Sequence, residues 1–372
     1  MFAIERKNMT SAFEPIQVGP YELKNRIVMS PMTRSRAYGN GFSPTPLMAE
    51  YYAQRAGAGL IVTEGTQPSV IGQGYPNTPG LHSELQVDGW RGVTDAVHAR
   101  GGVIFAQLMH TGRMGHPTNY TKPATPVGAS AVRAAGRIYT PSGPQDLVTP
   151  EPLTAEQIQE TIEDFAAAAK NAMRAGFDGV ELHGANGYLL HQFLSTNANQ
   201  RDDEWGGSAT NRSRLIIETV RAVASAIGAE RTALRISPAN PLGDIAEADY
   251  TQTYPIVLDA IGGLGLAYLH VLESTAPEFT ATLRAAWNGV LMVNPATPGG
   301  HTSEEQLQLI EDGATDLISF GQLFIANPDL VERLATGAPL ALPDLSKAYG
   351  GDERGYTDYP TLSESSTQTA AA

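Results

Sequence analysis

Residues 179–182 read GVEL and run directly into the polar, glycine-rich segment HGANGY at 183–188. A short apolar run of this kind is typical of a strand buried on both faces of a parallel sheet. Seven more short runs of the same character recur along the chain, at 26–30, 60–64, 103–108, 233–236, 267–272, 290–293 and 317–320. The sequence therefore predicts eight buried strands.

Helical patterns separate these strands, at 47–55, 86–99, 155–175, 211–227, 254–261, 278–286, 303–311 and 329–335. Eight strands that alternate with eight helices predict an α/β fold, a (β/α)8 TIM barrel. A doubly wound open sheet is the alternative, but it would more usually have fewer strands in a domain of this length.

Three segments lie outside the repeat. Residues 15–24 predict a small N-terminal hairpin, and the Pro-, Gly- and Ala-rich residues 117–150 predict a cap or lid that leaves the end of the third strand. The polar residues 363–372 predict a disordered tail. We expect residues 1–362 to form a single domain, because the composition does not divide the chain into two halves.

Composition excludes several classes of function. The chain of 372 residues has no cysteine, which rules out disulfides, thiolate metal sites and cysteine nucleophiles. Its net charge of −14 argues against a nucleic-acid surface, and no run approaches the ~20 apolar residues of a membrane helix. The histidines show no metal-binding spacing. We expect a soluble, cytoplasmic protein without a catalytic metal.

Barrel enzymes assemble their active sites at the carboxyl ends of the strands. The most informative group is His183, Asn186 and Tyr188, where three hydrogen-bonding side chains follow the fourth strand within six residues. A histidine and an asparagine can donate to one carbonyl oxygen, and a phenol can protonate a carbon formed beside it. A lone histidine is more often structural, but three convergent groups at this position favour a functional site.

Two other features leave alternatives open. Arg235 stands in an apolar strand and needs an acceptor, which is either a structural carboxylate or an electron-rich ligand. Gly299-Gly300 precede a helix start after the seventh strand, where barrels recurrently bind phosphate. An ordinary turn followed by a helix cap explains the two glycines equally well.

Long motifs resemble the Old Yellow Enzyme family of FMN-dependent ene-reductases, from about Phe13 to Pro360. They are NRIVMSPMTR at 25–34, EYYAQR at 50–55, QLMHTGR at 107–113, VELHGANGYLLHQFL at 180–194, NQRDDEWGGS at 199–208, IANPDL at 325–330 and GYTDYP at 355–360. The resemblance implies a single flavin-binding barrel that takes hydride from NADPH or NADH onto FMN and reduces the C=C bond of an enone, enal, maleimide or nitroalkene.

The resemblance also implies a role for each residue. Thr33 would contact the flavin near its hydride-carrying nitrogen, and Gln107 and Arg235 would bind its pyrimidine edge. His183 and Asn186 would hold the substrate oxygen, while Tyr188 would donate the proton. Further cofactor contacts would come from Pro31, Met32, Gly65, Gly299, Gly300, Gly321 and Gln322, and the substrate pocket would be lined by Tyr75, Met109 and Tyr356. Members of the family are monomers or homodimers.

One residue departs from the family pattern. Many members carry an arginine that grips the FMN phosphate at the position of Gln322. Either backbone amides and the Gly299-Gly300 turn hold FMN here, or the site takes a deazaflavin coenzyme whose phosphate is esterified. A catalytically idle ligand-binding barrel is a third alternative, which the intact His183, Asn186 and Tyr188 disfavour.

Overall fold

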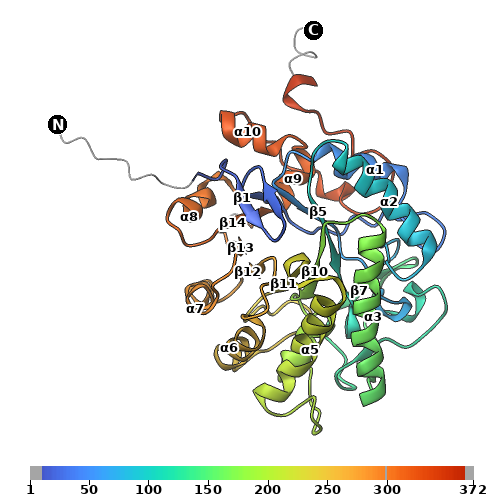
Figure 1. The fold of residues 1–372 in the computed structure, drawn as a ribbon. Helices are drawn as coiled ribbons and strands as arrows, with labels where there is room; N and C mark the ends of the chain where they lie inside the picture. Colours follow the sequence, from blue (N-terminus) through green and yellow to red (C-terminus); the bar gives the residue numbers. More distant parts are fainter. Residues whose placement is uncertain (1–10, 298–299, 365–372) are drawn as a thin grey trace.

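The computed structural model describes residues 11–297 and 300–364 (Figure 1). Eight parallel strands close into a barrel, and each hydrogen-bonds to the next along the chain. They are β3 (Ile27–Met29), β4 (Leu60–Val62), β5 (Ile104–Leu108), β10 (Gly179–Gly184), β11 (Thr232–Ile236), β12 (Leu269–Leu272), β13 (Leu291–Asn294) and β14 (Leu317–Phe320). The predicted (β/α)8 barrel is confirmed, and the open sheet is wrong because β14 pairs with β3.

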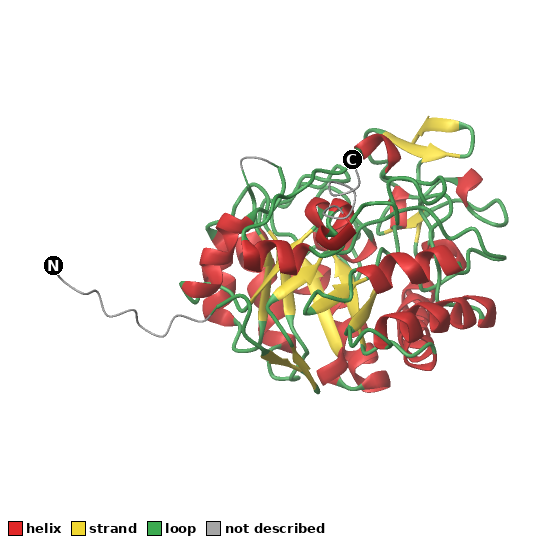
Figure 2. Cartoon of the chain, turned by 90° about the horizontal axis from the view of Figure 1, so that it is seen from above, coloured by secondary structure: helices red, strands yellow, loops and turns green. Residues whose placement is uncertain are grey.

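Helices surround the strands (Figure 2). All eight predicted helices are present within a few residues of their expected bounds, the penultimate one beginning with the 3-10 turn Glu304–Leu307. They are α1 (Pro46–Gln54), α2 (Glu84–His98), α3 (Ala155–Arg174), α5 (Ala209–Ile227), α6 (Tyr250–Ile261), α7 (Phe279–Ala286), α8 (Gln308–Glu311) and α10 (Leu330–Thr336). Two short helices were not predicted, α4 (Leu189–Leu194) and α9 (Gln322–Ala326).

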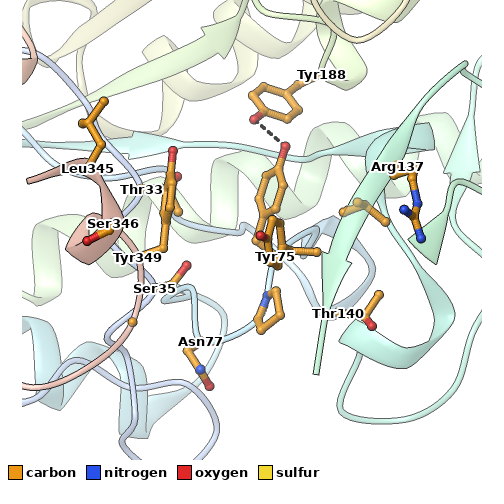
Figure 3. Close-up of a pocket in the computed structure, with 14 residues that line it drawn as sticks. Thr33, Ser35, Tyr75, Asn77, Arg137, Thr140, Tyr188, Leu345, Ser346 and Tyr349 are labelled. Atoms are coloured by element: carbon orange, nitrogen blue, oxygen red, sulfur yellow. Dashed lines mark hydrogen bonds between the residues drawn. The ribbon is translucent and has the colours of Figure 1, made fainter. Parts of the chain in front are cut away.

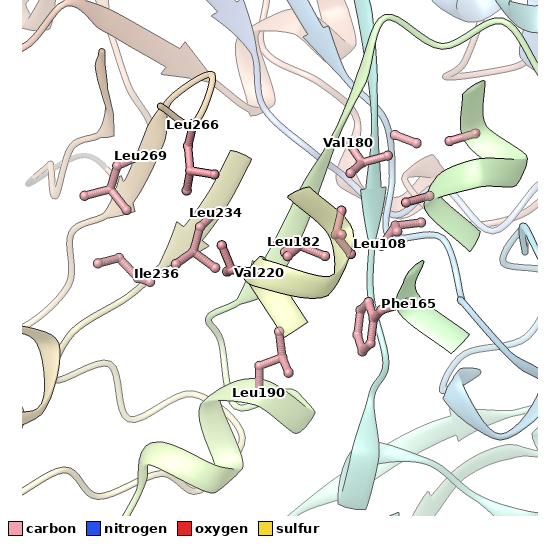
Figure 4. Close-up of a cluster of buried hydrophobic side chains, with 14 of the residues drawn as sticks. Leu108, Phe165, Val180, Leu182, Leu190, Val220, Leu234, Ile236, Leu266 and Leu269 are labelled. Atoms are coloured by element: carbon pink, nitrogen blue, oxygen red, sulfur yellow. The ribbon is translucent and has the colours of Figure 1, made fainter. Parts of the chain in front are cut away.

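The main core lies between the barrel and its helices. Leu182 and Leu234 point outward from the strands and pack with Phe165 of α3 and Val220 of α5 (Figure 4). Every residue of β10 is buried: Val180 and Leu182 face the helices, and the polar Glu181 and His183 alternate with them on the inner face. Gly179 is required in β10 because a Cβ there would lie 2.5 Å from the Phe105 ring.

The N-terminal hairpin is confirmed as β1 (Ile16–Val18) and β2 (Tyr21–Leu23). Val18 and Leu23 pack with Leu60 and Leu317, which are the first residues of two barrel strands. The hairpin therefore closes the amino-terminal end of the barrel. Any site must open at the opposite end.

The excursion after β5 is also confirmed. Its strands β6 (Val127–Gly128) and β9 (Glu151–Pro152) pair at its base, and β7 (Arg137–Thr140) and β8 (Gly143–Asp146) form an exposed hairpin. The predicted disordered tail lies, from residue 365 onward, outside the described residues. That residues 1–362 form one domain stays a prediction.

Candidate active site

A cavity of about 760 Å³ opens at the carboxyl end of the barrel (Figure 3). It lies between the loops after β3 and β4, the hairpin strand β7, the start of α4 and the C-terminal segment. Its lining residues are Thr33, Ser35, Tyr75, Pro76, Asn77, Arg137, Ile138, Tyr139, Thr140, Tyr188, Leu345, Ser346, Tyr349 and Gly350. The excursion thus forms one wall, as the predicted cap requires.

The segment between β10 and α4 turns sharply. Asn186 and Gly187 both have left-handed backbones, with φ of 57° and 79°. A Cβ on Gly187 would lie 2.4 Å from the Leu242 carbonyl oxygen, so only glycine fits there. Two side chains of α4 hold this peptide, because Gly187 N–H donates to His191 Nδ1 at 3.0 Å and Gln192 Nε2 donates to the Gly187 carbonyl at 2.7 Å.

His183 is the penultimate residue of β10 and is buried. Its Nδ1 accepts the Ala185 N–H at 3.2 Å, which leaves the proton on Nε2 and makes that atom the available donor. Burial, and then the positive charge of Arg235, hold the pKa of His183 well below its usual value. His183 is therefore a neutral hydrogen-bond donor at neutral pH.

Asn186 has a fixed side-chain orientation. Its Oδ1 accepts from Asn240 Nδ2 at 3.0 Å, and Asn240 in turn uses its own Oδ1 to accept the Leu242 N–H at 3.1 Å. The second contact identifies which end of the Asn240 amide is the donor. Asn186 Nδ2 is consequently the atom left to donate to a ligand.

Tyr188 points into the cavity (Figure 3). Its hydroxyl lies 3.1 Å from that of Tyr75, and its ring meets His183 edge-on with centroids 4.8 Å apart. Burial, and then the neighbouring Tyr75, raise the pKa of Tyr188 well above its usual value. The phenol therefore keeps its proton in neutral solution.

The predicted flavin contacts after β3, β4 and β14 differ in how tightly they are packed. Pro31, Met32 and Thr33 are half-buried although they follow a fully buried strand, and Thr33 lines the cavity. A Cβ on Gly321 would meet only Met32 Sδ, at 3.7 Å. Gly65 differs, because it packs against Met109.

Arg235 and Gln107 meet the requirements of the pyrimidine edge of a flavin. Arg235 is buried, its Nη2 lies 3.3 Å from Asn294 Oδ1, and its Nε has no hydrogen-bond partner within the described residues. A buried guanidinium with unused donors needs an electron-rich ligand. Gln107 donates Nε2 to Glu181 at 2.8 Å, which leaves its oxygen to accept an N–H. The residues present therefore fit a flavin.

The predicted phosphate region is less complete. Gln322 is half-buried and begins α9, and Gly300 is exposed with φ of 72°, while Gly299 lies outside the described residues. Residues 294–302 and 321–329 contain no lysine or arginine. The phosphate contacts stay a prediction.

Two predicted pocket residues lie elsewhere. Tyr356 does not line the cavity: its ring is fully buried, stacks on Tyr51 at 4.0 Å and lies 4.3 Å from the Arg36 guanidinium carbon. Tyr349, seven positions earlier, lines the wall instead. Met109 is 4% exposed and packs on Gly65 rather than lining the cavity. The segment AYGGDERGY offers both tyrosines, and sequence alone does not distinguish them.

The described residues contain no helix long and apolar enough to cross a membrane. Nor does this part of the chain bring three or more His, Asp or Glu residues together as a potential metal site.

The barrel and the residues at its carboxyl end fit a flavin-dependent oxidoreductase. The model of the NADH:flavin oxidoreductase / NADH oxidase family matches residues 11–341. The chain is 41% identical to 12-oxophytodienoate reductase 7 of Oryza sativa subsp. japonica, over 97% of each chain. It is also 41% identical to a probable flavin mononucleotide-dependent alkene reductase of Leishmania infantum, over 96% of this chain and 99% of the relative.

Solved structures agree. An old yellow enzyme homologue from Zymomonas mobilis superposes with a TM-score of 0.91 at 38% identity, covering 95% of this chain and 100% of that one. Morphinone reductase gives 0.90 at 39% identity, covering 96% and 98%. The chain therefore belongs to the NADH:flavin oxidoreductase / NADH oxidase family, and its resemblance to Old Yellow Enzyme is confirmed. It is an NAD(P)H-dependent oxidoreductase with FMN as cofactor.

Proposed function

We propose that the enzyme reduces the C=C bond of α,β-unsaturated carbonyl or nitro compounds. The observations that support this most are that fixed hydrogen bonds leave His183 Nε2 and Asn186 Nδ2 as donors, and that the His183 ring meets the ring of Tyr188, whose hydroxyl keeps its proton. Activated alkenes need both functions, because negative charge develops on the oxygen and a proton must reach carbon.

Bound FMN would accept hydride from NADPH or NADH and supply it to the far carbon of the double bond. His183 and Asn186 bind the substrate oxygen and lower the barrier by stabilising its developing charge. Their orientations are set before substrate arrives, by Ala185 and Asn240, so no reorganisation is needed. Tyr188 donates its phenolic proton to the near carbon, and the Tyr75 hydroxyl beside it holds the phenol in place.

The alternative to FMN that the sequence left open, a deazaflavin coenzyme, rests on the neutral Gln322 alone. An absorption spectrum of protein purified from a host without deazaflavin separates the two. Yellow protein that is bleached by NADPH or NADH supports FMN. Colourless protein that stays inactive with added FMN but reacts with reduced deazaflavin would show that the coenzyme is deazaflavin rather than FMN.

The activation role is tested with the double variant His183→Ala/Asn186→Ala. The bound flavin is first reduced with dithionite and then mixed with an enone, which isolates the step that needs the two donors. We expect reoxidation by the enone to slow by at least about 100-fold, the typical loss for an oxyanion donor. The control is His98→Ala, which lies outside the cavity and pairs with Asp178. Unchanged reoxidation in the double variant would refute the role.

A further inference from the structure

A chain of buried polar side chains crosses the barrel one layer deeper than His183. Gln107 Nε2 donates to Glu181 Oε1 at 2.8 Å, Glu181 Oε2 lies 2.8 Å from His270 Nδ1, and His270 Nε2 lies 2.9 Å from Ser319 Oγ. These residues come from β5, β10, β12 and β14, and each is at most 2% exposed. A buried carboxylate in a barrel interior is costly, so its presence requires a reason.

The direction of each hydrogen bond follows from the charge of Glu181. Burial alone would raise the pKa of this carboxyl, but His270, Arg235 and Gln107 together hold it below its usual value, so it is ionised. An ionised carboxylate only accepts. Gln107 must therefore donate its nitrogen, and His270 must carry a proton on Nδ1. Burial, as the largest cause, lowers the pKa of His270, so its Nε2 is unprotonated and accepts from Ser319.

Arg235 lies beside this chain of polar residues. It is the register partner of His270 on the neighbouring strand, and its positive charge acts on Glu181. Arg235 and Glu181 thus form a buried pair with no net charge, although no direct hydrogen bond joins them. Arg235 keeps an unpartnered Nε, so the carboxylate balances its charge without using up its donors.

We propose that Glu181 is a positioning residue for the bound flavin, which both orients the Gln107 amide and sets the flavin reduction potential by balancing Arg235. The proposal rests on the predicted contacts of Gln107 and Arg235 with the cofactor. With its nitrogen turned toward Glu181, Gln107 has its oxygen free to accept, which suits the single N–H of the pyrimidine edge. With its charge balanced, Arg235 favours the electron-rich reduced flavin less than an isolated guanidinium would.

The substitution Glu181→Gln separates charge from geometry. The new amide has the same shape, and its oxygen can still accept from Gln107. Its nitrogen then faces His270, whose proton can move to Nε2 and donate to Ser319, so every hydrogen bond is retained. Only the negative charge is lost.

The test is the midpoint potential of bound FMN in the holoenzyme, measured without alkene. We expect Glu181→Gln to raise the midpoint potential by at least about 30 mV. For a two-electron couple this is a tenfold change in the ratio of oxidised to reduced flavin. Ser319→Ala removes the last hydrogen bond of the buried polar network but keeps the charge of Glu181. The midpoint potential of this variant should differ from that of wild type by less than a threefold change in the same ratio. An unchanged potential in Glu181→Gln, or an equal shift in Ser319→Ala, would overturn the charge role.

Glu181→Asp tests whether Glu181 orients the Gln107 amide. This test can be made even if Glu181→Gln fails to fold. It keeps the charge but withdraws it from Gln107, so FMN should bind several-fold more weakly at a nearly unchanged potential. Binding as tight as wild type would overturn the orienting role. Because neither measurement involves an alkene, these outcomes are distinguishable from a failure of the proposed alkene reduction.

Discussion

Single hydrogen bonds decide what the site residues can do. The Ala185 N–H selects the tautomer of His183, and Asn240 selects the orientation of Asn186, so both present N–H groups rather than acceptors. The site is therefore preorganised for an oxygen that gains negative charge. The third residue, Tyr188, has a separate task.

Tyr188→Phe should separate the two halves of the catalytic cycle. The variant loses the proton donor but keeps the flavin contacts, so reduction of bound FMN by NADPH should stay within about twofold of wild type. Alkene reduction should fall by a factor on the order of 100 to 10,000, the usual contribution of a positioned acid. Stopped-flow absorbance of each half-reaction checks this. Tyr250→Phe, on α6 and outside the cavity lining, is the control, and equal losses in both half-reactions would contradict the assignment.

At the scale of elements, the sequence predicted the barrel strands better than the two short helices that follow β10 and β14. The eight strands are short apolar runs because both faces are buried, and this signal needs no knowledge of the fold. The helices α4 and α9 were missed because they are only six and five residues long, and α9 begins two residues after β14 ends. Glu181 was missed because a strand pattern does not show that β5, β10 and β12 bring its partners together.

Tyr349 illustrates a second limit. Its segment is placed by Arg34 and Arg36, which donate to the carbonyls of Ala348 and Lys347 at 2.8 and 3.1 Å. These contacts span more than 300 residues of sequence, and nothing local to residues 345–350 indicates them. The same cluster buries Tyr356, the residue that the sequence favoured.

Glu64, the carboxylate of this arginine–tyrosine cluster, should make stability depend on pH. It is fully buried, and burial raises its pKa from 4.5 to about 7. Between these values the folded state binds the proton more tightly than the unfolded state does. Protonation of Glu64 therefore contributes on the order of 3 kcal/mol to the unfolding free energy. This contribution is fully present below about pH 4.5 and is lost as the pH rises through 7.

Glu64→Gln should remove this dependence. Denaturant midpoints from pH 5 to pH 8 should fall less steeply in the variant than in wild type. Glu50→Gln, which changes an exposed carboxylate of α1, should run parallel to wild type. Parallel curves for wild type and Glu64→Gln would show that the carboxylate does not titrate in this range.

The loop after β14 is the place where FMN affinity should be improvable. Gln322→Arg adds a charged donor at the start of α9, where the phosphate contacts are predicted. A charge-assisted hydrogen bond of about 1.5 kcal/mol corresponds to about tenfold tighter FMN binding. Quenching of flavin fluorescence measures this, with riboflavin as the ligand that lacks the phosphate. Gln308→Arg adds the same charge on α8 as a control, and a gain for riboflavin equal to that for FMN would contradict a phosphate contact.

At the scale of the whole molecule, the negative net charge of the protein repels the nicotinamide coenzyme. The protein has a net charge of −14, and NADPH and NADH carry phosphates of the same sign. Arg137, on the hairpin strand β7, is the only Lys, Arg, Asp or Glu among the residues that line the described cavity. Its side chain is 63% exposed, lies 3.5 Å from Asp146 and donates from Nη2 to the Pro144 carbonyl at 2.6 Å, surface contacts with which an anion in the cavity can compete.

Arg137→Gln should therefore slow flavin reduction by several-fold at low coenzyme concentration. It should also make the rate less dependent on salt, because salt at 0.1 M screens charges beyond about 10 Å and so weakens the same attraction between Arg137 and the coenzyme phosphates. Reoxidation by an uncharged enone should not change. Arg133→Gln makes an identical change of charge in the same excursion, away from the cavity lining. Stopped-flow reduction at several ionic strengths distinguishes the two variants: equal effects would mean that net charge alone governs the encounter, whereas an effect confined to Arg137→Gln would locate the coenzyme phosphates at the hairpin.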